Sequence, residues 1–124
     1  MIKTMVLIAA GGMAGSLCRY LLYTLVTKNI DHLFPAATFI VNASGCLLIG
    51  MLWGLSQKHN GIHHDLQALL MIGFCGAFTT FSAFSVENLQ LIEKGHFLMA
   101  LSYAVMSVVA GILLTYAGFW MIKQ

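Results

Sequence analysis

Residues 73 to 84 read GFCGAFTTFSAF, and this stretch decides how the chain folds. It lies inside the apolar segment that runs from about Leu66 to Ile92. Glycine is a poor helix former, and the β-branched threonines that follow the glycines do not restore helix propensity. A run of leucine and valine would form a transmembrane helix with less difficulty. The stretch therefore predicts a helix that is broken near its middle.

The composition of the whole chain is that of an integral membrane protein. Of its 124 residues, 60% are hydrophobic and 8% are charged, and the mean hydropathy is +0.88. A soluble domain needs more charge to cover its surface. Each apolar segment reaches the ~20 residues that a helix needs to cross a bilayer. We predict an all-α membrane protein with one domain, residues 1–124, and four transmembrane helices at about 5–27, 36–56, 66–92 and 97–122.

The distribution of basic residues leaves the orientation in the membrane undecided. Short connections make consecutive helices antiparallel neighbours, and four spans place both termini on one side. Three basic residues fall on the side of the termini and three on the other: Lys3, Lys58 and Lys123 against Arg19, Lys28 and Lys94. Orientation follows the bias of Lys and Arg between loops. The balance predicts insertion in both directions, and hence an antiparallel, dual-topology homodimer.

Small residues and potential metal ligands are also scattered along the chain. Two GxxxG patterns, at 11–15 and 50–54, predict close helix contacts, within one chain or between two. The cysteines all lie in apolar segments, at Cys18, Cys46 and Cys75, and are interpreted as packing residues rather than disulfides. One loop carries His59, His63 and His64, where a solvated loop is favoured over a metal site.

Several polar residues lie at membrane depth, where a polar side chain is energetically costly and is usually paired or functional. Arg19 either extends its charge to the interface or attracts anions in a vestibule. Asn42 either bonds a neighbouring helix or donates its amide to a passing anion. Tyr103 and Ser107 are four residues apart and share a helix face, as ordinary polar residues or as part of a pathway. The role of Glu87, as interfacial residue, gate or proton carrier, stays open.

The broken segment itself offers two kinds of ligand. A break at membrane depth frees backbone carbonyl oxygens, which are suitable ligands for a small cation. After the break, Phe81 and Phe84 share one face, while Thr79 and Ser82 share the adjoining face. Aromatic ring edges carry partial positive charge, so they can line a path for a small anion. From spacing alone, a packed aromatic helix is the favoured interpretation.

Three motifs are distinctive: GGMAGSLCRY in the first segment, FIVNASGCLLIG in the second and GFCGAFTTFSAFS in the third. They resemble the motifs of the Fluc family of small bacterial fluoride channels. The fourth segment matches more loosely, through Tyr103 and Ser107, and the resemblance covers essentially the whole chain. Ala77 departs from the family pattern, where a second glycine is common, and Ala83 replaces a common threonine.

The resemblance implies passive export of cytoplasmic fluoride, which relieves fluoride toxicity, through a dual-topology homodimer in the bacterial inner membrane. It also implies a structural sodium ion (Na⁺) at the dimer centre, held by the backbone carbonyls of Gly76 and Thr79. Arg19 matches the family's arginine in the first helix, interpreted as a vestibule charge. The implied ion-pathway residues are Asn42, Phe81, Phe84, Tyr103 and Ser107, with Thr80 and Ser82 as further polar lining.

Two other functions have partial support in the sequence. A small proton-coupled multidrug exporter has a similar size, but it needs a carboxylate within the membrane, and Glu87 is the one candidate. A membrane assembly subunit without transport explains the glycines but not Asn42 or the phenylalanine pair. No nucleophile–base pair or phosphate-binding loop indicates an enzyme. A net charge of +2 from few basic residues argues against nucleic acid as a partner, and the expected partners are fluoride, lipid and a second copy.

Overall fold

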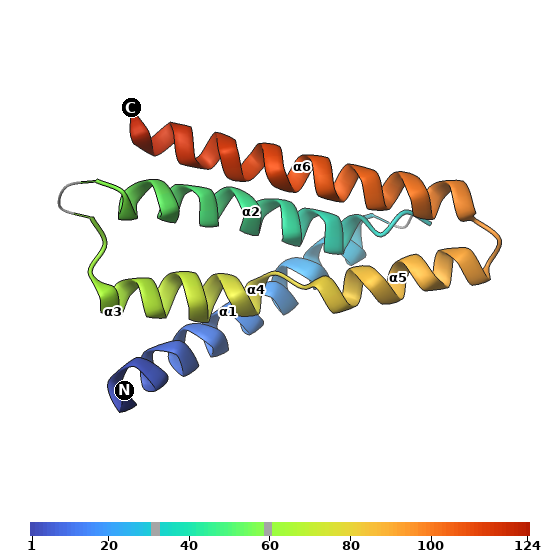
Figure 1. Cartoon of the computed structure of the whole chain (residues 1–124). Coiled ribbons are helices and arrows are strands. Elements are labelled where there is room, and N and C mark those ends of the chain that lie inside the picture. The colour runs from blue at the N-terminus through green and yellow to red at the C-terminus, as the bar shows by residue number, and fades with distance from the viewer. Residues whose placement is uncertain (31–32, 59–60) are drawn as a thin grey trace.

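Four long helices make up the protein in this computed structural model, which describes residues 1–30, 33–58 and 61–124. Each is long and apolar enough to cross a membrane: α1 (Ile2–Asn29), α2 (Ala36–Ser56), a third segment (His64–Glu93) and α6 (Phe97–Lys123). The described residues form no β-strand. Both termini lie at the same end of the bundle (Figure 1). The predicted all-α class with four membrane-spanning helices is therefore confirmed.

The third segment is the interrupted one, as predicted. It consists of α3 (His64–Gln67), the π-helix η1 (Ala68–Cys75), α4 (Gly76–Phe78) and α5 (Phe81–Glu93). Between α4 and α5 the backbone is extended, with ψ of 155° at Thr79 and 118° at Thr80. The break thus falls on the two threonines, while Gly76 before them keeps helical angles. Figure 1 shows it as an open stretch of ribbon near mid-segment.

The π-helix η1 packs directly on the first GxxxG pattern. A Cβ atom at Gly11 would lie 2.0 Å from the Leu69 carbonyl oxygen, and one at Gly15 would lie 2.3 Å from that of Phe74. Only glycine allows this approach of two backbones. The glycines are four residues apart, but the carbonyls they meet are five apart. A π-helix uses i→i+5 hydrogen bonds, so it places five residues where an α-helix places about four.

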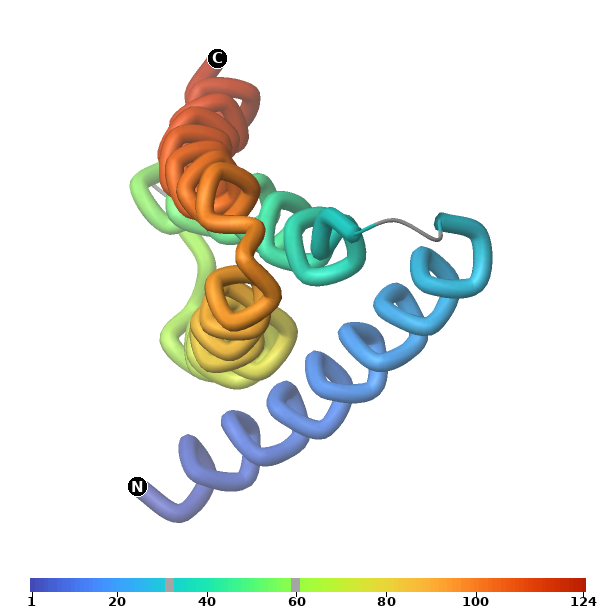
Figure 2. The backbone as a smooth tube through the Cα atoms, turned by 90° about the vertical axis from the view of Figure 1, so that its right-hand side faces the viewer, coloured from blue at the N-terminus to red at the C-terminus, as the bar shows by residue number. Residues whose placement is uncertain are grey.

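Helices α2 and α6 form a second close pair, built on the other GxxxG pattern. A Cβ atom at Gly50 would lie 2.0 Å from the Thr115 carbonyl oxygen. The Thr115 hydroxyl also donates to the Cys46 carbonyl at 3.1 Å. Both GxxxG patterns therefore make contacts within one chain. In Figure 2, α1 crosses the view diagonally and diverges from the pair formed by α2 and α6.

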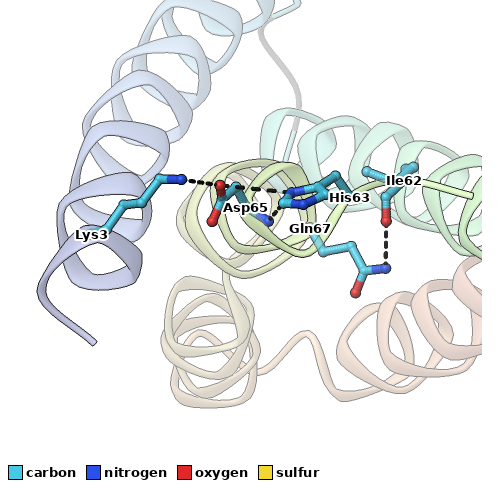
Figure 3. A network of polar contacts seen from close by, with 5 residues as sticks. All are labelled: Lys3, Ile62, His63, Asp65 and Gln67. Carbon is cyan, nitrogen blue, oxygen red and sulfur yellow. Dashed lines mark hydrogen bonds and ion pairs between the residues drawn. The ribbon is translucent and has the colours of Figure 1, made fainter.

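The start of the third segment is fixed by a small polar network (Figure 3). The Asp65 amide donates to His63 Nδ1 at 3.3 Å, so His63 caps α3, and Gln67 Nε2 donates to the Ile62 carbonyl at 2.9 Å. Lys3 of α1 forms an ion pair with the Asp65 carboxylate. This network joins the beginning of α1 to the beginning of α3 at the end of the bundle that carries both termini.

The remaining candidate metal and thiol residues are dispersed. His59 lies outside the described residues, and within the described ranges no three His, Cys, Asp or Glu side chains form a group that could hold a metal ion. The cysteines are free thiols: Cys18 is exposed, Cys46 half-buried and Cys75 buried.

Candidate functional site

The break in the third segment is bridged by one side chain from α2. Asn42 Nδ2 donates to the Thr80 carbonyl at 3.0 Å, and Asn42 Oδ1 accepts from the Thr80 amide at 2.8 Å. One amide side chain thus satisfies both backbone groups of a residue that has left the helix. The interhelical bond considered for Asn42 is present, and the second N–H of its amide group is left for another acceptor.

The threonines use their hydroxyls to end one helix and begin the next. The Thr79 hydroxyl donates to the Cys75 carbonyl at 2.9 Å, where the Thr79 amide also donates at 3.1 Å. The Thr80 hydroxyl accepts from the Ala83 amide at 3.2 Å, which makes Thr80 the N-cap of α5. Ser82 lies beside this cap, with its hydroxyl oxygen 3.3 Å from that of Thr80.

A cavity of about 430 Å³ lies against the break, between α2, the third segment and α6. It is bordered by seven of the ten residues that the sequence predicted: Asn42, Gly76, Thr79, Thr80, Phe81, Phe84 and Ser107. The Ser107 hydroxyl oxygen is buried and has no hydrogen-bond partner among the described residues. A buried hydroxyl without a partner is costly, which makes it available to a ligand in this cavity.

The two phenylalanines stand at the edge of this cavity in contact with each other. Their ring centroids are 5.5 Å apart, with the planes tilted by 37°. Phe84 also packs against Tyr103, with centroids 5.0 Å apart, whereas Phe81 is 79% exposed. Among the described residues, Phe84 is thus the one aromatic partner of Phe81, and most of the Phe81 side chain is left uncovered by this chain.

Tyr103 is placed differently from the other predicted pathway residues. It is fully buried, and its hydroxyl donates to Glu87 Oε2 at 2.8 Å. The buried Thr38 hydroxyl donates to the other oxygen, Glu87 Oε1, at 2.5 Å. Tyr103 is not among the described residues that border the cavity, although it supports Phe84 there. Thr38 was missed from the sequence, yet it precedes Asn42 by one helical turn and shares its face.

A second cavity, of about 540 Å³, lies between α1, α2 and α5. Arg19, Ser16 and Tyr20 border it from α1, and Ser82 borders it from α5. Thr80 borders both cavities. The predicted vestibule arginine and the hydroxyl of Ser82 thus share a cavity that adjoins the one beside the phenylalanines, with Thr80 between them.

Comparison with known proteins identifies the family. The model for "CrcB-like protein, Camphor Resistance (CrcB)" matches residues 6–119. The chain belongs to the CrcB family. Among its relatives, a protein from Flavobacterium psychrophilum is 43% identical over 122 residues, 98% of each chain. One from Methylobacillus flagellatus is 45% identical over 119 residues, 95% of this chain and 93% of that one. Both are named "Fluoride-specific ion channel FluC".

In this CrcB-family chain, the break leaves the carbonyls of residues 76–79 without the amides they would meet in a continuous helix, and two of these carbonyls, those of Gly76 and Thr79, are the predicted sodium ligands. In a continuous helix, the Gly76 carbonyl would accept from the Thr80 amide, and the Thr79 carbonyl would accept from the Ala83 amide. Both amides donate to side chains instead. Carbonyl oxygens beside a helix break suit a hard cation such as sodium. A Cβ atom at Gly76 would meet nothing within 4 Å, so this position is open on the single chain.

Proposed function

We infer that this chain is a fluoride-specific ion channel and a multi-pass membrane protein. The observation that carries the inference is the identity of 43–45% to channels of that name, over almost the full length of both chains. Such a channel has no need of an enzyme's chemistry. Fluoride leaves the cytoplasm down its electrochemical gradient through the inner membrane, which relieves fluoride toxicity.

The cavity beside the break is the proposed path for the ion. Fluoride is strongly hydrated, so a selective path must replace water with hydrogen-bond donors and still let the ion leave. The remaining N–H of Asn42, the unpartnered hydroxyl of Ser107 and the ring edges of Phe81 and Phe84 supply such donors. No lysine or arginine borders this cavity among the described residues, which avoids binding the ion too tightly.

Tyr103 takes part in the path indirectly in this proposal. Its hydroxyl is engaged by Glu87, and its ring packs against Phe84 at a centroid distance of 5.0 Å. It therefore fixes the orientation of the Phe84 ring edge. Glu87, which accepts from Tyr103 and Thr38, holds this support in place.

The second cavity is the proposed vestibule. Arg19 provides a positive charge that raises the local concentration of anions. The hydroxyls of Ser82 and Thr80, 3.3 Å apart, supply polar lining from there to the path. In this proposal an anion passes from one cavity to the other at Thr80, the residue that borders both.

A second, oppositely oriented copy completes the path in this proposal. Phe81 is 79% exposed, and the position of Gly76 is open, so the single chain leaves one side of the cavity uncovered. The equal numbers of basic residues at the two ends allow insertion in both directions. The proposed assembly is an antiparallel homodimer with two pores.

The carbonyls of Gly76 and Thr79 would hold a structural sodium ion at the centre of this dimer. Sodium, when bound, would supply a fixed positive charge and join the two copies. The chain's own contribution is a pair of backbone oxygens whose helical donors are engaged elsewhere. Because the ligands are backbone groups, no carboxylate is needed.

The test of the function is fluoride efflux from liposomes that hold the purified protein, with a potassium ionophore to balance charge. Fluoride release without chloride release is expected from a selective channel. If a monodisperse, sodium-containing sample released no fluoride, the proposal that the protein is a fluoride channel would be wrong. Proton-driven uptake of a cationic drug, lost in Glu87→Gln, would then identify an exporter.

A further inference from the structure

Two of the amides beside the break, those of Thr80 and Ala83, are diverted from their helical acceptors by side chains. A break alone would leave amides and carbonyls equally unpaired, and at membrane depth each unpaired group is costly. Here the amides of Thr80 and Ala83 donate to side chains, so they do not donate to the carbonyls that would accept them in a continuous helix. The two carbonyls concerned, of Gly76 and Thr79, are those proposed to bind sodium.

Asn42 diverts the first amide. Its Oδ1 accepts from the Thr80 amide at 2.8 Å, and its Nδ2 donates to the Thr80 carbonyl at 3.0 Å. If this side chain could not accept, the Thr80 amide would lose the hydrogen-bond acceptor that the structure gives it. The helical acceptor one turn back is the Gly76 carbonyl. Re-forming that bond would extend α4 and occupy the oxygen that a cation needs.

Thr80 diverts the second amide with its own side chain. Its hydroxyl accepts from the Ala83 amide at 3.2 Å, as the N-cap of α5. Without the cap, the helical acceptor of the Ala83 amide would be the Thr79 carbonyl. The neighbouring Cys75 carbonyl shows the contrast, because it accepts from both the amide and the hydroxyl of Thr79. The Cys75 carbonyl thus has two donors, whereas none of the described residues is seen to donate to the Gly76 carbonyl.

We propose that Asn42 and Thr80 are positioning residues for the cation, which keep the carbonyls of Gly76 and Thr79 available by holding the competing amides. Asn42 thereby links the anion path to the cation site, because it borders the proposed path and controls a proposed sodium ligand. This inference rests on the sodium site of the proposed function. It concerns residues that need not touch the cation themselves.

The test measures sodium binding to the purified full-length chain in detergent without any fluoride flux. The melting temperature and the dimer fraction by size exclusion are followed as sodium replaces N-methyl-D-glucamine. Asn42→Leu keeps the side-chain volume but cannot accept the Thr80 amide. We expect its sodium midpoint to rise about ten- to hundredfold, the usual cost of removing a residue that orients a metal ligand.

Two comparisons separate positioning from general damage. Ser107→Ala alters the same cavity but removes no hydrogen bond to Thr80, and its sodium midpoint should equal that of the unmodified chain. Thr80→Val removes the cap at nearly constant shape and should raise the midpoint, whereas Thr80→Ser restores a hydroxyl and should return it. The Thr80 pair keeps the test decisive if Asn42→Leu does not fold.

The outcomes separate this inference from the function on which it rests. If sodium shifts the unmodified chain and Asn42→Leu or Thr80→Val equally, the positioning role is wrong while the sodium site stands. A midpoint that rises as much in Ser107→Ala would also overturn it, because the effect would not be specific to the diverted amides. If sodium has no effect on the unmodified chain, both the sodium site and this inference fail.

Discussion

Helix α6 and the third segment cross the same bundle in different ways. Helix α6 is 27 residues of continuous α-helix, whereas the third segment spans 30 residues and is divided into four elements. Both contain glycines, and α6 remains intact through Gly111 and Gly118. The third segment breaks instead at Thr79 and Thr80, where Asn42 supplies hydrogen bonds from another helix. Glycine content permits a break, but a partner for the freed backbone decides where it occurs.

The two helices also differ in what they offer to the cavity. Helix α6 contributes Ser107, a hydroxyl on an unbroken helix. The third segment contributes freed carbonyls, the Thr80 hydroxyl and a pair of aromatic rings from the start of α5. Helix α6 thus closes one side of the cavity, and the third segment supplies most of its polar and aromatic groups.

The largest effect is expected where the continuous helix meets its neighbour. Gly50→Ala would place a Cβ atom 2.0 Å from the Thr115 backbone oxygen, and overpacking of this kind costs about 1–3 kcal/mol or more. We expect a large fall in the melting temperature and loss of monodisperse protein. The matched control is Gly111→Ala on α6, whose Cβ atom would lie 3.4 Å from the Cys46 sulfur. Equal melting temperatures for both would contradict the close-contact argument.

On the interrupted helix, the phenylalanines should affect transport more than stability. Phe84→Ile and Phe81→Ile remove ring edges, whose contacts are worth about 0.5–1.5 kcal/mol, so fluoride efflux should fall by up to about tenfold. Size exclusion should still show an assembled protein. Phe97→Ile, an exposed residue at the start of α6, serves as the control and should conduct normally. Unchanged efflux in both single variants would exclude these rings from the path.

A smaller effect is expected where the two helices meet through Tyr103 and Glu87. Tyr103→Phe removes the hydrogen bond of 2.8 Å between α6 and α5, and Glu87→Gln weakens it by removing the charge of the acceptor. Interhelical hydrogen bonds in membranes average about 0.6 kcal/mol in double-mutant cycles. We expect the double variant to be less destabilised than the sum of the single variants by about that amount. Strict additivity in unfolding free energy would mean that the two groups do not act together.

The smallest effect is expected at the end of the bundle that carries the termini. Lys3→Met removes the ion pair with Asp65 shown in Figure 3, but the Lys3 side chain is 74% exposed. Exposed ion pairs contribute little because water screens them. The melting temperature and the efflux rate should not change measurably. A clear loss of stability would show that this contact, rather than the glycine contacts, fixes α1 to the third segment.

The sequence was sufficient for the helices and for the existence of a break, but not for its position. Hydropathy and length predict four spans because both are local properties of the chain. The break falls on Thr79 and Thr80 rather than on the glycines because its partner, Asn42, is distant in sequence. Gly73 serves another purpose, since a Cβ atom there would lie 2.7 Å from the Ile8 carbonyl oxygen.

The candidate site was predictable to a similar degree. Motif and spacing selected Asn42, Phe81, Phe84 and Ser107, which border one cavity. Tyr103 shares a helix face with Ser107, but its hydroxyl is taken by Glu87, a partner that spacing does not reveal. The π-helix was not predicted, because a helix that is apolar on all sides has no polar period from which to read its pitch.

The meeting of η1 with α1 has a consequence for the length of the chain. Gly11 and Gly15 are four residues apart, and they meet carbonyls that are five residues apart, those of Leu69 and Phe74. Before its break, the third segment therefore contains one residue more than an α-helix would need to make the same two contacts. Removal of one residue between these two carbonyls would leave an ordinary α-helical turn of about the same rise. A deletion, which elsewhere in a transmembrane helix rotates everything that follows by about 100°, can here be absorbed.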